Sequence, residues 1–350
     1  MKARGATANP KPRFDTLEFE PDPTALEFEE AIEPRTRFLT DASRSVITRN
    51  NSPDIPFDFS LNPYRGCEHG CSYCYARPSH EYLGLSAGLD FERIIFVKKN
   101  AAQLLEAELR RKSWRPQLLQ LSGITDPYQP VERHLQITRQ CLQVLLEFRN
   151  PVGIITKNHL VTRDIDLLQE LARLELTHVT LSITTLDEQL RRRLEPRTST
   201  AERRLAAVRK LSDAGIKVHV NVAPLIPAVN DHEIPDILQA AADAGASSAS
   251  YTVLRLPGAV AEVFAGWLAE HLPERSEKVL GRVRQMRGGR LSTSEFRNRM
   301  RGSGEYAAQL SQLFRVARAR CGLDGQRPSS GLRTDLFRVP GSSEQPGLFD

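Results

Sequence analysis

The chain has 350 residues, of which 40% are hydrophobic and 26% charged, and it carries a formal net charge of +5. This length and composition suit one large hydrophobic core or two modest ones. No apolar stretch is long enough to span a membrane, and the first residues lack the apolar segment of a secretory signal, so we expect a soluble protein without a membrane partner.

The first 45 residues predict an extended, poorly ordered arm. Five prolines interrupt this segment, and positions 14 to 34 hold eight acidic residues and no basic one. A segment of this composition buries too little apolar surface to fold alone. We therefore expect the folded core to begin near residue 46.

Between residues 46 and 272, short apolar runs alternate with helical stretches. This alternation is typical of a parallel sheet with helices between its strands, and six units predict an α/β fold, a partial (β/α)6 TIM-like barrel. The predicted strands are 57–61, 118–121, 152–156, 178–183, 217–222 and 250–254, and the predicted helices are 100–112, 131–148, 162–174, 200–214 and 231–244. An apolar run at 94–97 has no place in this scheme.

Three cysteines follow the first predicted strand in one short loop. They are Cys67, Cys71 and Cys74 in the run N-P-Y-R-G-C-E-H-G-C-S-Y-C-Y at 62–75, a C-x3-C-x2-C pattern. Three thiolates so close together can reach three irons of a 4Fe-4S cubane and leave the fourth iron without a protein ligand. The alternative is a zinc site, which needs a fourth ligand such as His69. Unpaired thiols suit a reducing compartment, so we expect the protein in the cytoplasm.

This loop resembles the hallmark of the radical SAM superfamily, in which an aromatic residue takes the position of Tyr73. The strings at 62–67 and 73–78, Asn-Pro-Tyr-Arg-Gly-Cys and Tyr-Cys-Tyr-Ala-Arg-Pro, are similar to those of a bacterial branch known as DNA repair photolyase, which is related to spore photoproduct lyase. The similarity runs from about residue 54 to 321.

The resemblance implies two cofactors, a 4Fe-4S cluster and S-adenosylmethionine (SAM), and an external one-electron reductant. It also implies an activity, the reductive cleavage of SAM to a 5'-deoxyadenosyl radical that abstracts hydrogen from a substrate. Spore photoproduct lyase uses a further cysteine to return hydrogen to its product radical. Here Cys141 lies at helical spacing with apolar residues and predicts a buried core position instead, and Cys321 is isolated.

Polar residues follow the predicted strands at the barrel end where such a cofactor would bind. They are Ser122, Gly123, Thr125 and Asp126 after the second strand, Lys157 after the third, Ser182 and Thr184 at the fourth, and Asn221 in the fifth. Asp126 and the hydroxyl groups after the second strand offer acceptors for the SAM ammonium, and Lys157 offers a cation for the SAM carboxylate. Ser182 and Thr184 place their hydroxyl groups on one face of the strand and suit a ribose or a carboxylate. The alternatives are an ordinary Asp-Pro turn and a surface lysine.

The segment Leu194-Glu-Pro-Arg197 resembles a family segment that contacts polar groups of the cofactor. The resemblance implies that Glu195 faces a hydroxyl and that Arg197 forms a fork for a carboxylate. A structural Glu-Arg pair at a helix end is the alternative.

Residues 273–321 predict a basic helical extension of the core. Positions 275–301 hold nine basic residues against two acidic ones. Such an excess attracts phosphates and favours DNA as a partner, although a solvated helix face would look the same.

Residues 322–350 predict a flexible tail that ends in Gln-Pro-Gly-Leu-Phe-Asp. Gln345, Leu348 and Phe349 match the Q-x-x-L-F peptide with which bacterial repair and replication proteins bind the sliding clamp. An apolar end without function is the alternative.

Together these features predict a radical SAM enzyme that acts on damaged or modified DNA. Two other readings stay open. One is radical modification of RNA, peptide or protein, and the other is a cluster-bearing sensor or accessory protein without turnover that is recruited to the clamp.

Overall fold

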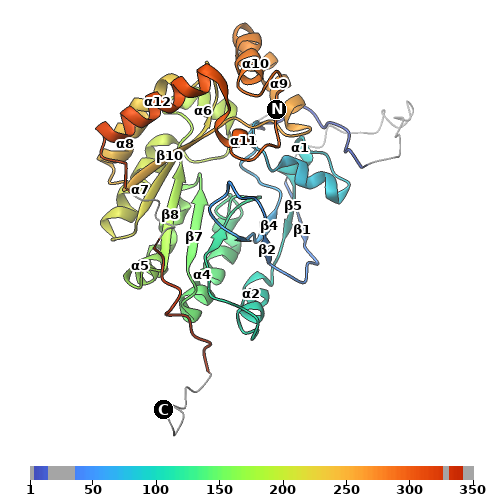
Figure 1. Cartoon of the computed structure of the whole chain (residues 1–350). Helices are drawn as coiled ribbons and strands as arrows, with labels where there is room; N and C mark the ends of the chain where they lie inside the picture. Colours follow the sequence, from blue (N-terminus) through green and yellow to red (C-terminus); the bar gives the residue numbers. More distant parts are fainter. Residues whose placement is uncertain (1–3, 15–35, 326–330, 342–350) are drawn as a thin grey trace, which may run out of the picture.

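Seven strands form the main sheet of the computed structural model, which describes residues 4–14, 36–325 and 331–341 (Figure 1). They are β2 (Ile47–Arg49), β3 (Phe59–Leu61), β6 (Leu119–Leu121), β7 (Val152–Thr156), β8 (Thr177–Ser182), β9 (Val218–Leu225) and β10 (Ser248–Val253). Six run parallel in the order β10-β9-β8-β7-β6-β3, and β2 pairs antiparallel with β3. The predicted α/β fold with six parallel strands is confirmed, and the sheet is that of a partial TIM-like barrel.

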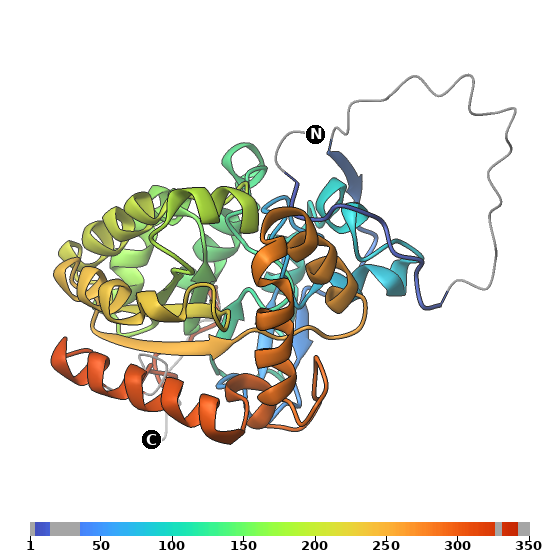
Figure 2. The same cartoon turned by 90° about the horizontal axis from the view of Figure 1, so that it is seen from above.

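Helices connect successive strands of this sheet and lie on its outer side (Figure 2). They are α2 (Ala101–Leu109), α3 (Glu132–Leu135), α4 (Ile137–Phe148), α5 (Ile165–Arg173), α6 (Glu188–Leu194), α7 (Ala201–Asp213) and α8 (Ile234–Asp243). The helix predicted at 131–148 is divided, because Gln136 has a φ of 53° and ends α3. The helix predicted at 162–174 begins with a 3-10 turn, His159–Asp164.

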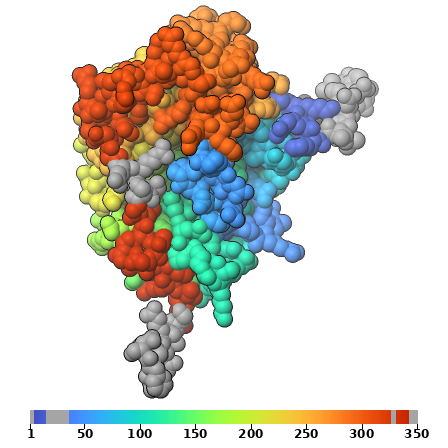
Figure 3. All heavy atoms as spheres, in the orientation of Figure 1, coloured from blue at the N-terminus to red at the C-terminus, as the bar shows by residue number. Residues whose placement is uncertain are grey.

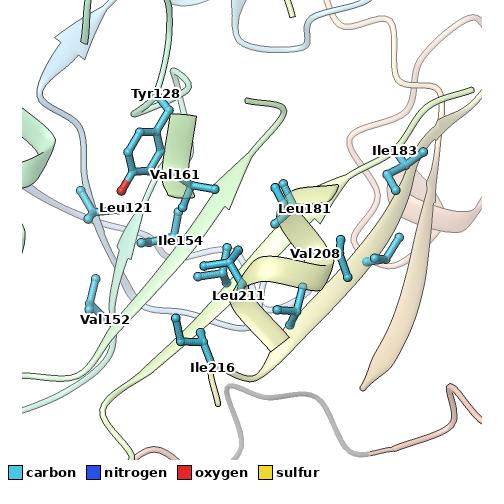
Figure 4. Close-up of a cluster of buried hydrophobic side chains, with 14 of the residues drawn as sticks. Leu121, Tyr128, Val152, Ile154, Val161, Leu181, Ile183, Val208, Leu211 and Ile216 are labelled. Carbon is cyan, nitrogen blue, oxygen red and sulfur yellow. The ribbon is translucent and has the colours of Figure 1, made fainter. Parts of the chain in front are cut away.

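The hydrophobic core lies between the sheet and these helices. Leu181 of β8 is fully buried there with Val208 and Leu211 of α7 (Figure 4). Val179 of the same strand is fully buried too. Because side chains alternate along a strand, this outward apolar row leaves the intervening residues for the inner face of the barrel.

The inner face is polar where β6, β7 and β8 meet. A Cβ on Gly153 would lie 2.6 Å from Oε1 of Gln120 and 2.7 Å from Cε1 of His178, so glycine is required for these two side chains to approach. Both side chains are buried, and Gln120 Nε2 and His178 Nδ1 make no hydrogen bond within the described part of the chain.

His178 should make the stability of the protein depend on pH. Burial lowers its pKa to about 4, from an ordinary value of about 6.5. Between these values the unfolded chain binds a proton that the folded chain does not. We therefore expect the free energy of unfolding to fall by up to about 3 kcal/mol as the pH drops from about 6.5 to about 4.

Urea unfolding at several pH values measures this effect. His178→Gln should remove most of the pH dependence in that window, whereas His134→Gln, at an exposed position on α3, should retain it. The same slope in the wild type and in His178→Gln would contradict the prediction.

A smaller sheet, in the order β1-β5-β4, lies beside the barrel. Its strands are β1 (Arg37–Thr40), β4 (Tyr64–Arg65) and β5 (Ile94–Val97), so the unplaced apolar run at 94–97 belongs here. In contrast to the expected disordered arm, β1 pairs with β5, and residues 4–14 pack on the core. The acidic part of that arm, 15–35, lies outside the described residues.

Helix α9 (Val260–His271) ends the segment predicted as the core, and the extension predicted at 273–321 contains α10 (Ser276–Gln285), α11 (Asn298–Arg301) and α12 (Gly304–Arg320). Helix α12 runs along the edge strand β10, where the ring centroids of Phe314 and Tyr251 are 4.7 Å apart (Figure 2). In contrast to a flexible tail, the Arg338 backbone N–H donates to the Phe148 carbonyl oxygen at 3.0 Å. The clamp-like peptide lies outside the described residues, and none of the described helices has the length and hydrophobicity to cross a membrane.

Candidate functional site

The cysteine loop follows β4 at the C-terminal end of the barrel. Cys67 and Cys71 are buried and Cys74 is partly exposed. Burial raises the pKa of all three thiols, and the nearby Asp126, Cys71 and Cys74 raise that of Cys67 further. Buried thiols that raise one another's pKa become thiolates only beside a cation, and iron ions would supply that charge. The donor set therefore fits a cluster.

A cubane requires a wider spacing of the thiol groups than a single metal ion does, because each cysteine binds a different iron. Among the described residues, no three His, Cys, Asp or Glu side chains converge as a site for one ion would require.

A buried arginine holds the backbone of this loop. Arg77 is fully buried, and its Nε and Nη2 both donate to the Cys71 carbonyl oxygen, at 3.0 and 2.7 Å. Its Nη1 donates to the carbonyl oxygens of Ala87 and Gly88. The charge is balanced by the buried Glu92, which forms a close ion pair with Nη2. Arg77 thus ties the second cysteine to residues 87–92.

The N-terminal segment covers the same loop. The backbone N–H groups of Gly5 and Ala6 donate to the Glu92 carboxylate at 3.1 and 2.8 Å. A Cβ on Gly5 would lie 1.6 Å from the Gly70 carbonyl oxygen, so only glycine fits here. Figure 3 shows this segment, in dark blue, against the cyan residues that follow the loop. We call residues 4–14 the N-terminal strap.

Four of the predicted cofactor contacts come together in one buried network beside Cys71. The Tyr73 hydroxyl donates to Glu195 and lies 3.3 Å from the Thr184 hydroxyl. Lys157 Nζ donates to Thr184 Oγ1 at 2.9 Å and lies 3.5 Å from Glu195 Oε2. Its ammonium is also 5.6 Å from the centroid of the Tyr73 ring. The network joins the cysteine loop to the ends of β7 and β8.

Glu195 is the charged centre of this network. It is fully buried and forms a close ion pair with Arg204 of α7, which is also buried. Burial acts to raise the pKa of Glu195, but the Arg204 guanidinium and the Lys157 ammonium outweigh it and lower the pKa to about 2. Glu195 is therefore ionised at neutral pH, and its oxygens already accept from Tyr73, Thr184 and Arg204.

Asp126 lies beside the loop, but other groups occupy its carboxylate. It accepts from Thr156 Oγ1 at 2.7 Å and from the backbone N–H of Lys157 and Tyr128 at 2.8 and 2.9 Å. His69 Nδ1 is 3.4 Å from Asp126 Oδ2, the oxygen that also accepts from the Lys157 N–H. These contacts favour a structural role, in which Asp126 joins the cysteine loop to the end of β7.

Arg197 also reaches the loop rather than open space. Its Nη2 donates to Glu68 Oε1 at 2.8 Å, and its Nη1 to Thr36 Oγ1 at 3.3 Å. Glu195 and Arg197 therefore do not pair with each other, and both anchor the cysteine loop from the segment after α6.

Residues 122–125 form a tight loop after β6. Ser122 has a φ of 140°, which is rare for a residue with a side chain, and its hydroxyl donates to the Thr125 carbonyl oxygen at 3.1 Å. Gly123 has a φ of 117°. Its carbonyl oxygen accepts from the hydroxyl of Tyr75, the residue after the third cysteine, at 2.8 Å. The loop thus lies against the cysteine loop.

Ser182 and Asn221 keep free hydrogen-bonding groups on the inner face. They are aligned partners on β8 and β9. Asn221 Oδ1 accepts from Ser250 at 3.2 Å, whereas Asn221 Nδ2 and Ser182 Oγ make no hydrogen bond within the described part of the chain. Of the predicted contacts, these two groups are the best placed to meet a ligand. Lys157 is the nearest predicted cation, and its Nζ donates to the Ala223 carbonyl oxygen at 2.8 Å as well as to Thr184.

Arg77, Glu92, Arg204 and the N-terminal strap were not predicted as parts of the site. Arg204 had a signal, because it lies at helical spacing with the buried Ala201, Val208 and Leu211. An arginine in an apolar stripe needs a buried partner. The sequence of the N-terminal strap contains no similar signal of its position.

The basic stretch is only partly available to a ligand. Arg287 is buried and donates to the carbonyl oxygens of Asn298 and Leu254, and burial lowers its pKa to about 10. Arg299 forms an ion pair with Asp54. These two arginines hold the extension on the barrel, in contrast to the expected free phosphate contacts.

The sequence is similar to proteins of one known superfamily. The family model of the radical SAM superfamily matches residues 61–241. An uncharacterised protein of Mycobacterium tuberculosis is 36% identical over 270 residues, which cover 76% of this chain and 77% of that protein. A protein of Pseudomonas phage M6 named radical SAM Nalpha-GlyT isomerase is 24% identical over 49% of this chain and 34% of that protein.

Solved structures of spore photoproduct lyase share the fold. One variant aligns with a TM-score of 0.55 over 81% of this chain and 80% of that one, at 16% identity. The lyase in complex with a dinucleoside spore photoproduct aligns with a TM-score of 0.51 over 68% of this chain and 66% of that one, at 17% identity. The second alignment spans about two thirds of the lyase chain.

Proposed function

Since the chain belongs to the radical SAM superfamily, we propose that it is an enzyme that holds a 4Fe-4S cluster on Cys67, Cys71 and Cys74 and uses SAM. The observation that carries the proposal is the set of three mutually close, largely buried thiols beside the Tyr73 and Glu195 network. When bound, cluster and SAM supply reductive cleavage of SAM and hydrogen abstraction from a substrate, with an electron from an external reductant.

The chain's own residues would seat and orient SAM. Lys157 offers an ammonium for the SAM carboxylate, and Ser182 and Asn221 offer hydrogen bonds to its ribose or carboxylate. Tyr73, Thr184 and Glu195 hold Lys157 in place. The remaining predicted residues keep the cysteine loop and the β6 loop in position: Ser122, Gly123, Thr125, Asp126 and Arg197.

Replacing Lys157 by methionine should raise the Kd for SAM about tenfold, because a hydrogen bond to a charged group contributes about 1.5–3 kcal/mol. Isothermal titration of SAM into the reconstituted protein under anaerobic conditions measures this. Lys210→Met, at an exposed position on α7, is the matched control and should bind like the wild type. An unchanged Kd in Lys157→Met, with iron content intact, would remove Lys157 from the SAM site.

For the substrate we propose damaged or modified DNA. The basic residues of 275–301 other than Arg287 and Arg299 support this, and so does the spore photoproduct lyase structure with a bound dinucleoside photoproduct. Binding to the sliding clamp through Gln345, Leu348 and Phe349 remains a prediction, and so does a cytoplasmic location.

The deciding experiment combines anaerobic reconstitution, reduction with dithionite, and SAM. We expect a brown protein that releases 5'-deoxyadenosine, faster with ultraviolet-irradiated DNA than with undamaged DNA. Colour without 5'-deoxyadenosine would contradict an enzyme and leave a cluster-bearing accessory protein. Stimulation by RNA or peptides but not by DNA would move the substrate to those classes.

A further inference from the structure

A cavity of about 620 Å³ runs along β10, the edge strand of the barrel, under α11 and α12. Figure 2 shows α12 beside this strand. Its volume lies within the range of about 300–1,000 Å³ typical of pockets for drug-sized ligands. No acidic residue lines it. The charged lining residues are Arg301, Arg315 and Arg318, and Ser311 is among the polar ones.

Three arginines give the cavity a positive charge. Within the described part of the chain, Arg301, Arg315 and Arg318 form no ion pair with a carboxylate, although many other arginines of this protein do. Uncompensated cations around a concave surface with low-dielectric walls concentrate a positive potential. The cavity therefore selects for anions.

Two of these arginines have surroundings that favour binding of an anion. The guanidinium carbon of Arg301 is 3.9 Å from the centroid of the Tyr251 ring, which itself packs on Phe314. A guanidinium held on a ring loses little freedom when it binds an anion. Nε of Arg318 is buried and has no hydrogen-bond partner within the described part of the chain. A buried donor of this kind is costly unless a ligand satisfies it.

A series of side-chain contacts links the wall of this cavity to the cysteine loop. Next to Arg301, the Met300 sulfur accepts from Arg255 at 3.7 Å, and the Arg255 guanidinium lies 5.3 Å from the centroid of the Tyr75 ring. Tyr75 is half exposed and follows Cys74 directly. The contacts of Arg255 thus place the wall of the cavity and the residue after Cys74 on either side of one arginine.

We propose that this cavity binds the phosphodiester backbone of one DNA strand. The neighbouring nucleotides of the same strand would then lie at the cluster loop. The inference rests on the proposed DNA substrate. Arginine is the residue best suited to phosphate, because its planar fork donates to two oxygens at once. The binding site is thus the edge of the barrel, rather than the whole basic stretch.

The test uses the reconstituted full-length protein and a fluorescein-labelled single-stranded 15-nucleotide DNA, with binding followed by anisotropy at several salt concentrations. Arg315→Ala/Arg318→Ala should bind about tenfold more weakly, and the slope of log affinity against log salt should fall by about 1.4, about 0.7 per lost phosphate contact. Arg111→Ala/Arg115→Ala removes the same charge from two exposed positions outside the cavity and should bind like the wild type.

A second variant avoids any effect on folding. Ser311 is exposed and lines the cavity, so Ser311→Glu adds a negative charge without removing packing and should also weaken binding. Equal losses in the cavity and control doubles, or no loss in any variant, would overturn the inference. Formation of 5'-deoxyadenosine without DNA, measured in the same samples, separates the two proposals. Its absence beside cavity-dependent binding would sink only the enzyme function, and its presence beside DNA binding that the cavity variants leave unchanged would sink only the cavity.

Discussion

Replacing Cys71 by alanine should leave the reconstituted protein without a stable cluster and without detectable 5'-deoxyadenosine. The Cys71 side chain is buried, and Arg77 holds the Cys71 backbone carbonyl oxygen, so the loop presents this thiol from a fixed position. An iron that loses its protein ligand exposes the cubane to solvent and to loss of iron. Iron content per chain, visible absorption and product release measure the effect.

The matched control is Cys321→Ala, at the end of α12, where the sulfur is partly exposed. This variant should keep the cluster and the product. If Cys71→Ala kept both, the three-cysteine assignment would be wrong. Cys141 is less suitable as a control, because it lies on the buried face of α4 and its loss would affect packing in the core.

Replacing Arg77 by methionine should lower the free energy of unfolding by about 3–5 kcal/mol, the typical cost of leaving one partner of a buried ion pair unpaired. Glu92 would remain buried without its ion-pair partner, and among the described residues its carboxylate would keep the hydrogen bonds from the backbone N–H groups of Gly5 and Ala6. The Cys71 carbonyl oxygen would lose two hydrogen bonds at the same time. We therefore expect a lower iron content as well, and urea unfolding together with iron analysis measures both effects.

A double variant separates charge from geometry. Arg77→Met/Glu92→Gln removes the uncompensated carboxylate but still lacks the bonds to Cys71, so it should recover stability and not iron content. Arg111→Met, in an exposed pair with Glu108, should cost less than about 1 kcal/mol. A loss of that small size in Arg77→Met would contradict a buried ion pair that holds the loop.

The parallel strands were predictable because each is a short apolar run followed by a helix. The run at 152–156 and the strand β7 coincide, and β8 and β10 differ from prediction by one or two residues at their ends. The antiparallel β2 and the strand β1 were missed. Both are short and largely exposed, and they form because a neighbouring strand offers free backbone groups rather than because of their own sequence.

The cysteines were evident from their spacing, but their surroundings were not. Lys157 and Thr184 lie at the C-terminal ends of neighbouring strands, so the barrel geometry alone predicted that they lie close together, and the two side chains are hydrogen-bonded. The roles of Asp126 and Arg197 depend on partners far away in sequence, such as His69 and Glu68, which no local pattern reveals. Arg77 lies in the string at 73–78 that resembles the related bacterial branch, but that string does not reveal its contacts. They are made with residues 87, 88 and 92, and they depend on how the chain turns after the loop.

The N-terminal strap affects how this protein can be shortened. The region that matches the superfamily model begins at residue 61, so a fragment cut to that region keeps all three cysteines and loses Gly5 and Ala6. In such a fragment Glu92 lacks two of its donors, and the surface of Gly70 that faces Gly5 opens to solvent and oxygen. Expression fragments for this family member are therefore best defined by what covers the cluster loop, not by where the recognisable domain starts.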